Sequence, residues 1–300
     1  MERSDRIINV SAIVADAVAD TLANSGEGEI LMVNSAGVYL GINENVIFLC
    51  DLDMGVVPIG ISIEGFCENV SKLRLSAGDR FSFDTNRLCF RGGELVLSPL
   101  QKADPLPFGI RPISSRVRAA ALELASLDRR NGLSMLVLPL VLERYDTDAP
   151  SLNPYCTRAY PLLYELIRAL VDGREDVITS CVSSLLGLGV GLTPSADDVL
   201  LGMIFALHKT GQEYSGSVRT FLESIERLCD SRTNRVSAAY LKALIDGARF
   251  EKMERLWRGL CGEAELDCRL LTDIGHSSGT EMLLGILCAL RVCGYSCTVQ

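Results

Sequence analysis

The side chains best suited to chemistry lie in two glycine-bearing stretches, each running into the start of a predicted helix. One is Gly187-Leu-Gly-Val-Gly-Leu-Thr-Pro-Ser-Ala-Asp-Asp198, and the other is Ile274-Gly-His-Ser-Ser-Gly-Thr-Glu281. Backbone N–H groups and the helix dipole favour an anion at such a junction. We therefore expect these stretches to bind an anion. The alternative is a pair of well-capped core helices without a ligand.

Two acids and one histidine are the candidate catalytic groups. Asp197 and Asp198 fall in the first turn of the predicted helix, where adjacent residues point about 100° apart. They cannot both cap the helix, so one is expected to face the loop or a neighbouring helix. An acid there could hold a divalent cation, orient a substrate amide, act as a base or only stabilise the helix start. His276 lies in the second polar loop, in a functional or a structural role.

The candidate anion-binding groups are loop glycines, which bring backbone N–H groups to a ligand, and the hydroxyls beside them. In the two stretches they are Gly189, Gly191, Thr193, Ser195, Ser277, Ser278 and Gly279. A third polar cluster, Ser231-Arg-Thr-Asn-Arg-Val-Ser237, adds Thr233 and Arg235 at another predicted helix start. Its hydroxyls and arginines suit a carboxylate or a phosphate, and a surface capping loop is the alternative.

The helices that follow the two stretches resemble each other. Residues 195–211 and 278–294 share a leading serine, Leu-Leu-Gly, Ala-Leu and a final glycine when aligned without a gap. Each opens with Ser-x-x-Asp/Glu, the capping box that satisfies free backbone donors at a helix start. Gly202 and Gly285 would let the two backbones approach closely. We predict a pseudo-symmetric pair of capped helices with both N-termini at one site.

Composition limits the classes of function. The chain of 300 residues has a formal net charge of -9 and a pI near 4.9, which argues against a nucleic-acid surface. No apolar run follows the charged residues at its start, so no secretory signal is predicted. No apolar run is long enough to span a membrane. We therefore expect a cytoplasmic protein that contacts neither membrane nor nucleic acid.

Residues that commonly bind transition metals are few or scattered. The 2 histidines exclude a histidine-rich metal site, and the 11 cysteines are spread along the chain, as expected for reduced core thiols. The spacing of Cys288, Cys293 and Cys297 is not that of a zinc knuckle. We therefore assign no metal site, and magnesium near the acids is the one cofactor left open.

The order of predicted elements indicates an α+β protein with a boundary near residue 110. Short β-branched or aromatic runs between turns predict a small antiparallel β barrel or sandwich over residues 1–110, after a short helix around 12–22. Amphipathic periodicity predicts a helical domain over residues 111–300. The expected strands are 29–33, 37–40, 46–50, 71–75, 80–83 and 94–97. The expected helices are 115–127, 161–170, 174–186, 195–207, 217–229, 235–246, 252–259, 263–271 and 278–292, with an exposed loop at 146–154.

The stretch 187–198 resembles the signature Gly-Leu-Gly-Pro-Gly-Leu-Thr-Pro-Ser-Gly-Asp-Asp of the DUF2877 family. Val190 and Ala196 replace the usual Pro and Gly, and Thr280-Glu281 stands where the family often has an aromatic residue and Asp. These replacements preserve the helix start but leave the substrate open. The other matching features are Leu201-Gly202, the cluster 233–237, Ala243, Gly247, the stretch 274–279 and Gly285.

The resemblance implies a subunit of a carbamoyltransferase complex in anaerobic allantoin and purine nitrogen catabolism. The family includes a subunit of oxamate carbamoyltransferase, which converts oxalurate and phosphate into oxamate and carbamoyl phosphate. It also implies FdrA-like and DUF1116-like protein partners. These substrates and products are anions, in agreement with the helix starts, hydroxyls and arginines of the sequence.

Two other functions fit the sequence. The chain could be a non-catalytic scaffold whose signature loops bind partner proteins, or a free-standing amidohydrolase acting on a ureido substrate. The sequence lacks a Gly-x-Ser-x-Gly elbow, and the loop at 187–195 lacks the Gly-Lys-Ser/Thr ending of a Walker motif. A serine hydrolase and a P-loop nucleotide site are therefore disfavoured.

Overall fold

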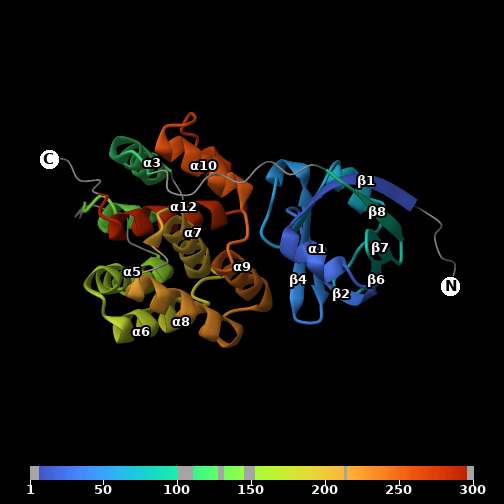
Figure 1. The fold of residues 1–300 in the computed structure, drawn as a ribbon, viewed down its shortest axis with the longest axis horizontal. Coiled ribbons are helices and arrows are strands. Elements are labelled where there is room, and N and C mark those ends of the chain that lie inside the picture. The colour runs from blue at the N-terminus through green and yellow to red at the C-terminus, as the bar shows by residue number, and fades with distance from the viewer. Residues whose placement is uncertain (1–6, 101–110, 128–131, 145–152, 213–214, 296–300) are drawn as a thin grey trace. The chain divides into compact units, whose positions relative to one another are not determined.

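The chain divides into two compact units in the computed structural model, which describes residues 7–100, 111–127, 132–144, 153–212 and 215–295 (Figure 1). The first unit comprises Met1–Pro105 with Ala248–Lys252, and the second comprises Leu106–Gly247 with Met253–Gln300. The expected boundary near residue 110 falls on residues 101–110, which lie outside the described residues. Most of the expected loop at 146–154 lies outside them as well.

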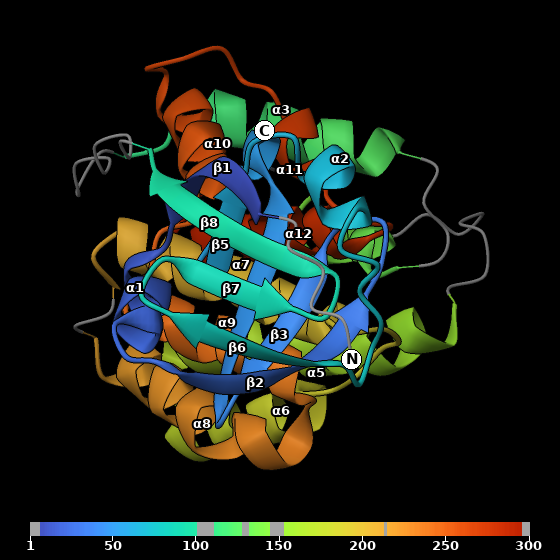
Figure 2. The same cartoon turned by 90° about the vertical axis from the view of Figure 1, so that its right-hand side faces the viewer.

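The first unit is a closed barrel with the strand order β1-β5-β4-β3-β2-β6-β7-β8 (Figure 2). An α+β protein with an N-terminal barrel is thereby confirmed. The strands are β1 (Ile7–Val14), β2 (Gly26–Val33), β3 (Val38–Ile42), β4 (Asn45–Asp51), β5 (Gly60–Ile63), β6 (Arg80–Asp84), β7 (Arg87–Phe90) and β8 (Gly93–Pro99). The barrel unit also holds α1 (Asp16–Leu22), η1 (Leu52–Met54) and α2 (Phe66–Ser71).

The prediction of an antiparallel barrel was wrong in part, because β1 pairs with β8 and β4 pairs with β5 in parallel. The closing pair joins strands that lie far apart in the sequence, so no hairpin signal marks it. The expected strand 71–75 was wrong, because α2 ends at Ser71 and a turn follows. The expected helix around 12–22 begins only at Asp16, since β1 continues to Val14.

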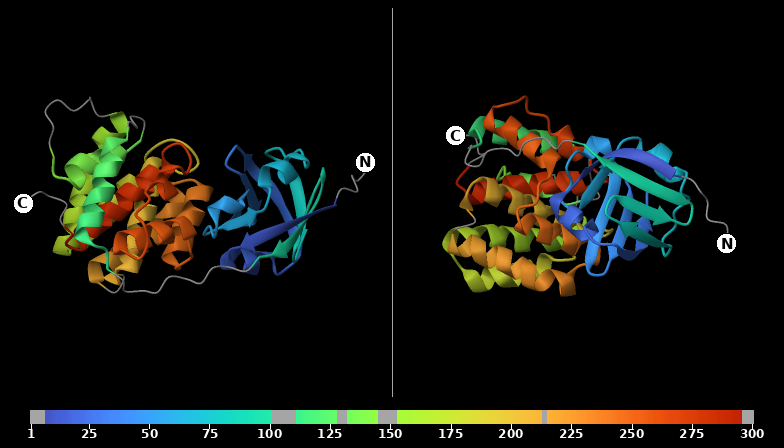
Figure 3. Two further views of the ribbon diagram at one scale, coloured as in Figure 1. Left: turned by 90° about the horizontal axis from the view of Figure 1, so that it is seen from above. Right: turned by 45° about the vertical axis from the view of Figure 1, so that its right-hand side comes forward.

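Side chains that alternate along the strands fill the barrel. In β6, Phe81 and Phe83 are buried and the residues between and beside them are exposed. Leu40, Ile61 and Leu95 from β3, β5 and β8 are fully buried and belong to the same apolar core cluster. This period of two is the one expected for strands with one face on a core. The views in Figure 3 show the sheet curving around this interior.

The second unit is helical throughout the residues described. Its elements are α3 (Ser114–Ser126), η2 (Ser134–Leu136), α4 (Val137–Leu140), α5 (Pro154–Asp172), α6 (Glu175–Leu185), α7 (Ser195–Lys209), α8 (Gly216–Arg232), α9 (Arg235–Ile245), α10 (Glu251–Cys261, which starts in the first unit), α11 (Arg269–Thr272) and α12 (Ser278–Val292). The helix expected from residue 161 begins at Pro154, because the Asn153 side chain caps it by accepting from the Cys156 N–H at 2.8 Å. The helix expected over 263–271 is reduced to the single turn of α11.

Helices α7 and α12 pack against each other at the centre of the helical unit. An added Cβ on Gly202 would lie 2.0 Å from the Met282 carbonyl oxygen, and one on Gly285 would lie 2.0 Å from the Val199 carbonyl oxygen. These glycines therefore let the two backbones meet, as the sequence predicts. The first turns of the two helices also meet, since the Ser195 hydroxyl lies beside the Glu281 carboxylate.

The capping boxes expected at these helices are not confirmed. The residue before α7 is Pro194 and the residue before α12 is Ser277, and neither makes a side-chain cap hydrogen bond. Ser195 and Ser278 are instead the first helical residues. Their hydroxyls and the carboxylates of the first turn are consequently available for contacts between helices.

The described cysteines are all free thiols, and six of them are buried: Cys50, Cys156, Cys181, Cys229, Cys268 and Cys288. Burial raises the pKa of the Cys50 and Cys288 thiols to about 12. These thiols therefore behave as small apolar core side chains at neutral pH. No helix within the described part of the chain is long and apolar enough to cross a membrane.

Candidate functional site

The two glycine-bearing stretches meet where α7 and α12 begin. The hydroxyl oxygens of Thr193 and Ser278 lie 3.1 Å apart and share a hydrogen bond. Both side chains are half-buried, so they lie between the interior of the junction and its surface. The structure thus brings residues from both predicted stretches together. We call this place, formed by residues 187–198 and 276–281, the α7–α12 junction.

The first glycine loop folds tightly over the start of α7. Gly189 adopts φ +133°, and an added Cβ there would lie 2.3 Å from the Ser195 backbone nitrogen. The Ala196 N–H donates to the Leu188 carbonyl oxygen at 2.9 Å, which fastens the loop to the helix. Gly191, at φ +99°, is exposed and has open space around it. The loop therefore needs glycine at both positions, but only Gly189 is held close to the helix.

Asp197 is fully buried and fully hydrogen-bonded. Its Oδ1 accepts from the Gly187 N–H at 2.8 Å, and its Oδ2 accepts from the Ser237 hydroxyl at 2.7 Å and from the Thr233 hydroxyl. Burial raises the pKa of Asp197, and these three donors act against that rise. The third polar cluster of the sequence is therefore joined to α7 through this carboxylate. Its contacts point to a structural clamp between α7 and the start of α9.

Asp198 lies next in the chain and has a different environment. It is fully buried, and neither of its carboxylate oxygens has a partner in hydrogen-bond geometry. Burial raises its pKa well above the usual range, and the negative charge of Glu281 raises it further. The nearby Ser278 and Thr193 hydroxyls lower the pKa of Asp198, although these hydroxyls bond to each other. A buried carboxylate without a partner is uncommon and is a candidate for chemistry.

Glu281 is the third buried carboxylate of the junction, and sequence reasoning treated it only as a capping acid. Its Oε1 accepts from the Leu133 N–H at 3.0 Å, and its Oε2 accepts from the Ser277 hydroxyl at 3.2 Å. Burial raises its pKa, while the Ser195 hydroxyl and the other donors lower it. The signal that could have identified it is its position, matching that of Asp198 in the aligned helices.

The remaining candidates differ in how close they lie to this junction. His276 is exposed in the loop before α12, where its charge lowers the pKa of Glu281. Gly279 serves packing, because an added Cβ there would lie 1.7 Å from the Leu271 carbonyl oxygen. Arg235 is the first residue of α9 and is half-buried. The site that the structure assembles is therefore built mainly from hydroxyls and carboxylates.

Replacing Asp198 by asparagine is expected to stabilise the protein at neutral pH. The pKa of Asp198 is higher in the folded than in the unfolded chain, so its contribution to folding is most favourable below its ordinary pKa. That contribution is lost as the pH rises through the folded-state pKa. The amide carries no charge to bury, so we expect a gain of about 1–3 kcal/mol near pH 8 that disappears near pH 4.

Chemical denaturation of wild type and variant across this pH range measures the effect. The exposed Glu223→Gln is the matched control and should follow the wild-type profile. Equal stability of Asp198→Asn and wild type at every pH would contradict the assignment of an unpaired buried acid. Asp197 and Glu281 keep their raised pKa values in the variant, so part of the wild-type pH dependence should remain.

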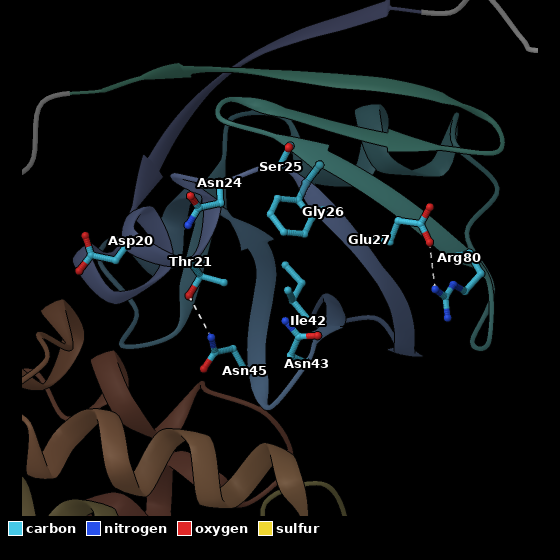
Figure 4. A pocket seen from close by; sticks show the side chains of 11 residues that line it. Asp20, Thr21, Asn24, Ser25, Gly26, Glu27, Ile42, Asn43, Asn45 and Arg80 are labelled. Atoms are coloured by element: carbon cyan, nitrogen blue, oxygen red, sulfur yellow. Dashed lines mark hydrogen bonds and ion pairs between the residues drawn. The ribbon is translucent and has the colours of Figure 1, made fainter.

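The barrel unit has a separate hollow of about 710 Å³, with walls from α1, β2, the β3–β4 hairpin and β6 (Figure 4). Figure 4 shows the Thr21 hydroxyl accepting from the Asn45 side chain and Arg80 paired with Glu27. These distances are 3.4 Å and 3.1 Å, and the charged side chains are exposed. None of the predicted site residues lines this hollow, so it is not part of the candidate site.

Comparison with known proteins gives a match over the region that carries both signature stretches. Residues 185–290 match the family model described as oxamate carbamoyltransferase subunit AllH. The family resemblance carried by the signature is confirmed over this part, about a third of the chain. No solved structure matches the chain.

Proposed function

We propose that this chain is a subunit of an oxamate carbamoyltransferase complex and that the α7–α12 junction forms part of its substrate site. The match of residues 185–290 to the AllH subunit model supports the assignment to such a complex. The observation that carries the site is Asp198, a fully buried carboxylate with no hydrogen-bond partner, beside hydroxyls from two helix starts. A buried carboxylate without a hydrogen-bond partner lowers the stability of the free chain, and a ligand that donates hydrogen bonds to it would remove that cost.

The proposed reaction transfers a carbamoyl group from oxalurate to phosphate. A phosphate oxygen forms a bond to the carbamoyl carbon, the bond from that carbon to the oxamate nitrogen breaks, and the nitrogen receives a proton. Carbamoyl phosphate and oxamate are the products. The half-buried hydroxyls of Thr193 and Ser278 can donate to phosphoryl or carboxylate oxygens. Asp198 can accept from the carbamoyl NH₂, which has two donors to offer.

Asp198 is a better candidate for this role than Asp197. The oxygens of Asp197 already accept from Gly187, Thr233 and Ser237, so a substrate amide would have to displace protein donors. The oxygens of Asp198 have no such partners to lose. FdrA-like and DUF1116-like subunits would complete the site, because the α7–α12 junction carries few cationic side chains for a phosphate.

Asp198→Asn is expected to abolish turnover by the assembled complex without unfolding the subunit. An amide in place of the carboxylate presents an N–H₂ group toward the substrate amide, so we expect a loss of about 10²–10⁴-fold in kcat. The measurement is carbamoyl phosphate formation from oxalurate and phosphate by the reconstituted complex, with subunit assembly checked by size-exclusion chromatography. Wild-type turnover by an assembled Asp198→Asn complex would show that Asp198 has no role in the reaction.

A second candidate function is a scaffold in which the signature loop docks a partner. It is favoured by Val190, which is 65% exposed at the tip of the loop between two glycines with positive φ. If the loop only docks a partner, Val190→Ser should weaken assembly while Asp198→Asn leaves both assembly and turnover intact. Full turnover by a complex containing Asp198→Asn would favour this second candidate.

A further inference from the structure

Glu281 holds three segments of the α7–α12 junction together. Its carboxylate accepts from the Leu133 N–H at 3.0 Å and from the Ser277 hydroxyl at 3.2 Å. The hydroxyl of Ser195, the first residue of α7, lies beside the same carboxylate. Glu281 is fully buried, and a carboxylate has about four lone-pair sites, so all three donors can share it. One side chain therefore joins the residue before η2 to the starts of α7 and α12.

A second support for Glu281 comes from Gly132, in the segment before η2. An added Cβ on Gly132 would lie 2.6 Å from the Glu281 Oε1 and 3.1 Å from the Ser277 Cβ, so this backbone contacts both side chains. The Gly132 carbonyl oxygen accepts from the Asn153 side chain at 2.8 Å and from the Cys156 thiol at 3.2 Å. Both donors lie at the start of α5. The carboxylate of Glu281 is therefore fixed by contacts that lead back to a third helix.

Ser195 carries this support to the signature loop. An added Cβ on Gly189 would lie 3.1 Å from the Ser195 Oγ and 2.3 Å from the Ser195 backbone nitrogen, so the loop rests directly on this residue. Ser195 is itself buried. Thr193, whose hydroxyl belongs to the proposed substrate site, lies between Gly189 and Ser195 in the chain. Both ends of the segment that carries Thr193 are therefore held at Ser195, and Ser195 lies against Glu281.

We propose that Glu281 is a positioning residue of the substrate site, acting through Ser195 and Ser277. Ser277 directly precedes Ser278, and the Ser278 hydroxyl is joined to that of Thr193 at 3.1 Å. Holding the two serines keeps this pair of hydroxyls in place before a ligand arrives. The role rests on the proposed function, in which the pair binds phosphoryl oxygens. Because preordered groups lower the cost of binding, the effect should fall mainly on the affinity for phosphate.

A role of charge alone is the competing explanation, because the negative charge of Glu281 raises the pKa of Asp198. Two substitutions separate position from charge. Aspartate keeps the charge but is shorter by one methylene group, which withdraws the carboxylate from its donors. Glutamine keeps the length without the charge: its carbonyl oxygen can accept from the Leu133 N–H, and its N–H₂ can donate to the serine hydroxyl oxygens. Position predicts the larger defect in Glu281→Asp, and charge predicts it in Glu281→Gln.

Steady-state kinetics of the reconstituted complex, with phosphate varied at saturating oxalurate, tests the proposal. We expect the KM for phosphate to rise about 10-fold in Glu281→Asp, with kcat within about 3-fold of the wild type, because hydrogen bonds that order the site are lost. Glu281→Gln should raise this KM by about 3-fold at most. Ser195→Ala should raise it about as much as Glu281→Asp, and the double variant should show no further rise, because both changes break one contact.

Glu223→Asp is the matched control, since it shortens an exposed glutamate of α8 and should leave the KM unchanged. A purely structural role for Glu281 would lower the melting temperature of the subunit and leave the KM of an assembled complex at the wild-type value. An unchanged KM in Glu281→Asp, or a larger defect in Glu281→Gln, would overturn the inference. If Glu281→Asp does not assemble, an unchanged KM in Ser195→Ala would overturn it as well.

The outcome for the proposed function is read separately. If Asp198→Asn abolishes turnover while Glu281→Asp keeps the wild-type KM, the proposed function stands and Glu281 has no positioning role. A wild-type complex that forms no carbamoyl phosphate from oxalurate and phosphate would overturn both.

Discussion

Gly285→Ala is expected to lower the free energy of unfolding of the helical unit by about 3 kcal/mol, the upper range for overpacking a well-packed core. The added Cβ would lie 2.0 Å from the Val199 carbonyl oxygen, and Gly202 lies across the same contact. The obstacle is backbone, which cannot rotate away as a flexible side chain can. Helices α7 and α12 would have to separate along their length.

Thermal and chemical denaturation of the full chain measures this effect. Gly216→Ala is the matched control: it lies in α8, and its added Cβ meets only the Glu175 side chain at 3.9 Å. The control should remain within about 1 kcal/mol of the wild type, because alanine is the better helix former. If both variants were equally stable, the close backbone contact between α7 and α12 would be wrong.

Asp197→Ala is expected to destabilise the protein by about 3 kcal/mol or more, because hydrogen bonds to a charged group contribute about 1.5–3 kcal/mol each. The Gly187 N–H and the Ser237 hydroxyl lose their acceptor, and Ser237 is fully buried. Asp197→Asn should cost less. Its amide oxygen can still accept from Gly187, and its amide N–H₂ can donate to the hydroxyl oxygens.

Substitutions of the two adjacent acids are therefore expected to change the free energy of unfolding in opposite directions. Asp197→Ala should unfold at lower denaturant concentration than the wild type, and Asp198→Asn at higher concentration near pH 8. Measuring both in the same buffer controls for changes in net charge, since each removes one carboxylate. A gain in stability from Asp197→Ala would contradict the clamp that joins α7 to α9.

The elements around the site were largely predictable because their signals are local. Glycine loops followed by hydroxyls and acids predict the starts of α7 and α12, and the glycines on their faces predict the close crossing. The sequence could not predict that the carboxylate of Asp197 is hydrogen-bonded while that of Asp198 is not. They depend on the position of Thr233 and Ser237, and no rule of spacing fixes that position.

The barrel shows the same division between local and distant information. Strands joined by tight turns, such as β3 and β4, were predicted from alternation and turn residues. The strands β1, β5 and β7 were missed. Of these, β1 and β5 take part in parallel pairs, whereas β7 is a four-residue strand in two antiparallel pairs. Parallel pairing brings together segments without a hairpin between them, so the sequence carries no short-range mark of the partner. Closure of the barrel through β1 and β8 therefore depends on the packing of the whole unit and not on a local sequence signal.

The separation of α7 from α12 along the chain also has a consequence during synthesis on the ribosome. Nearly every residue of α7 is buried, and much of that cover comes from α12, which follows some 80 residues later. At a translation rate of about 5–20 residues per second, α7 would wait several seconds or longer for this partner. An uncovered apolar helix is a target for aggregation and for chaperones. The nascent chain should therefore be most vulnerable between the emergence of these two helices.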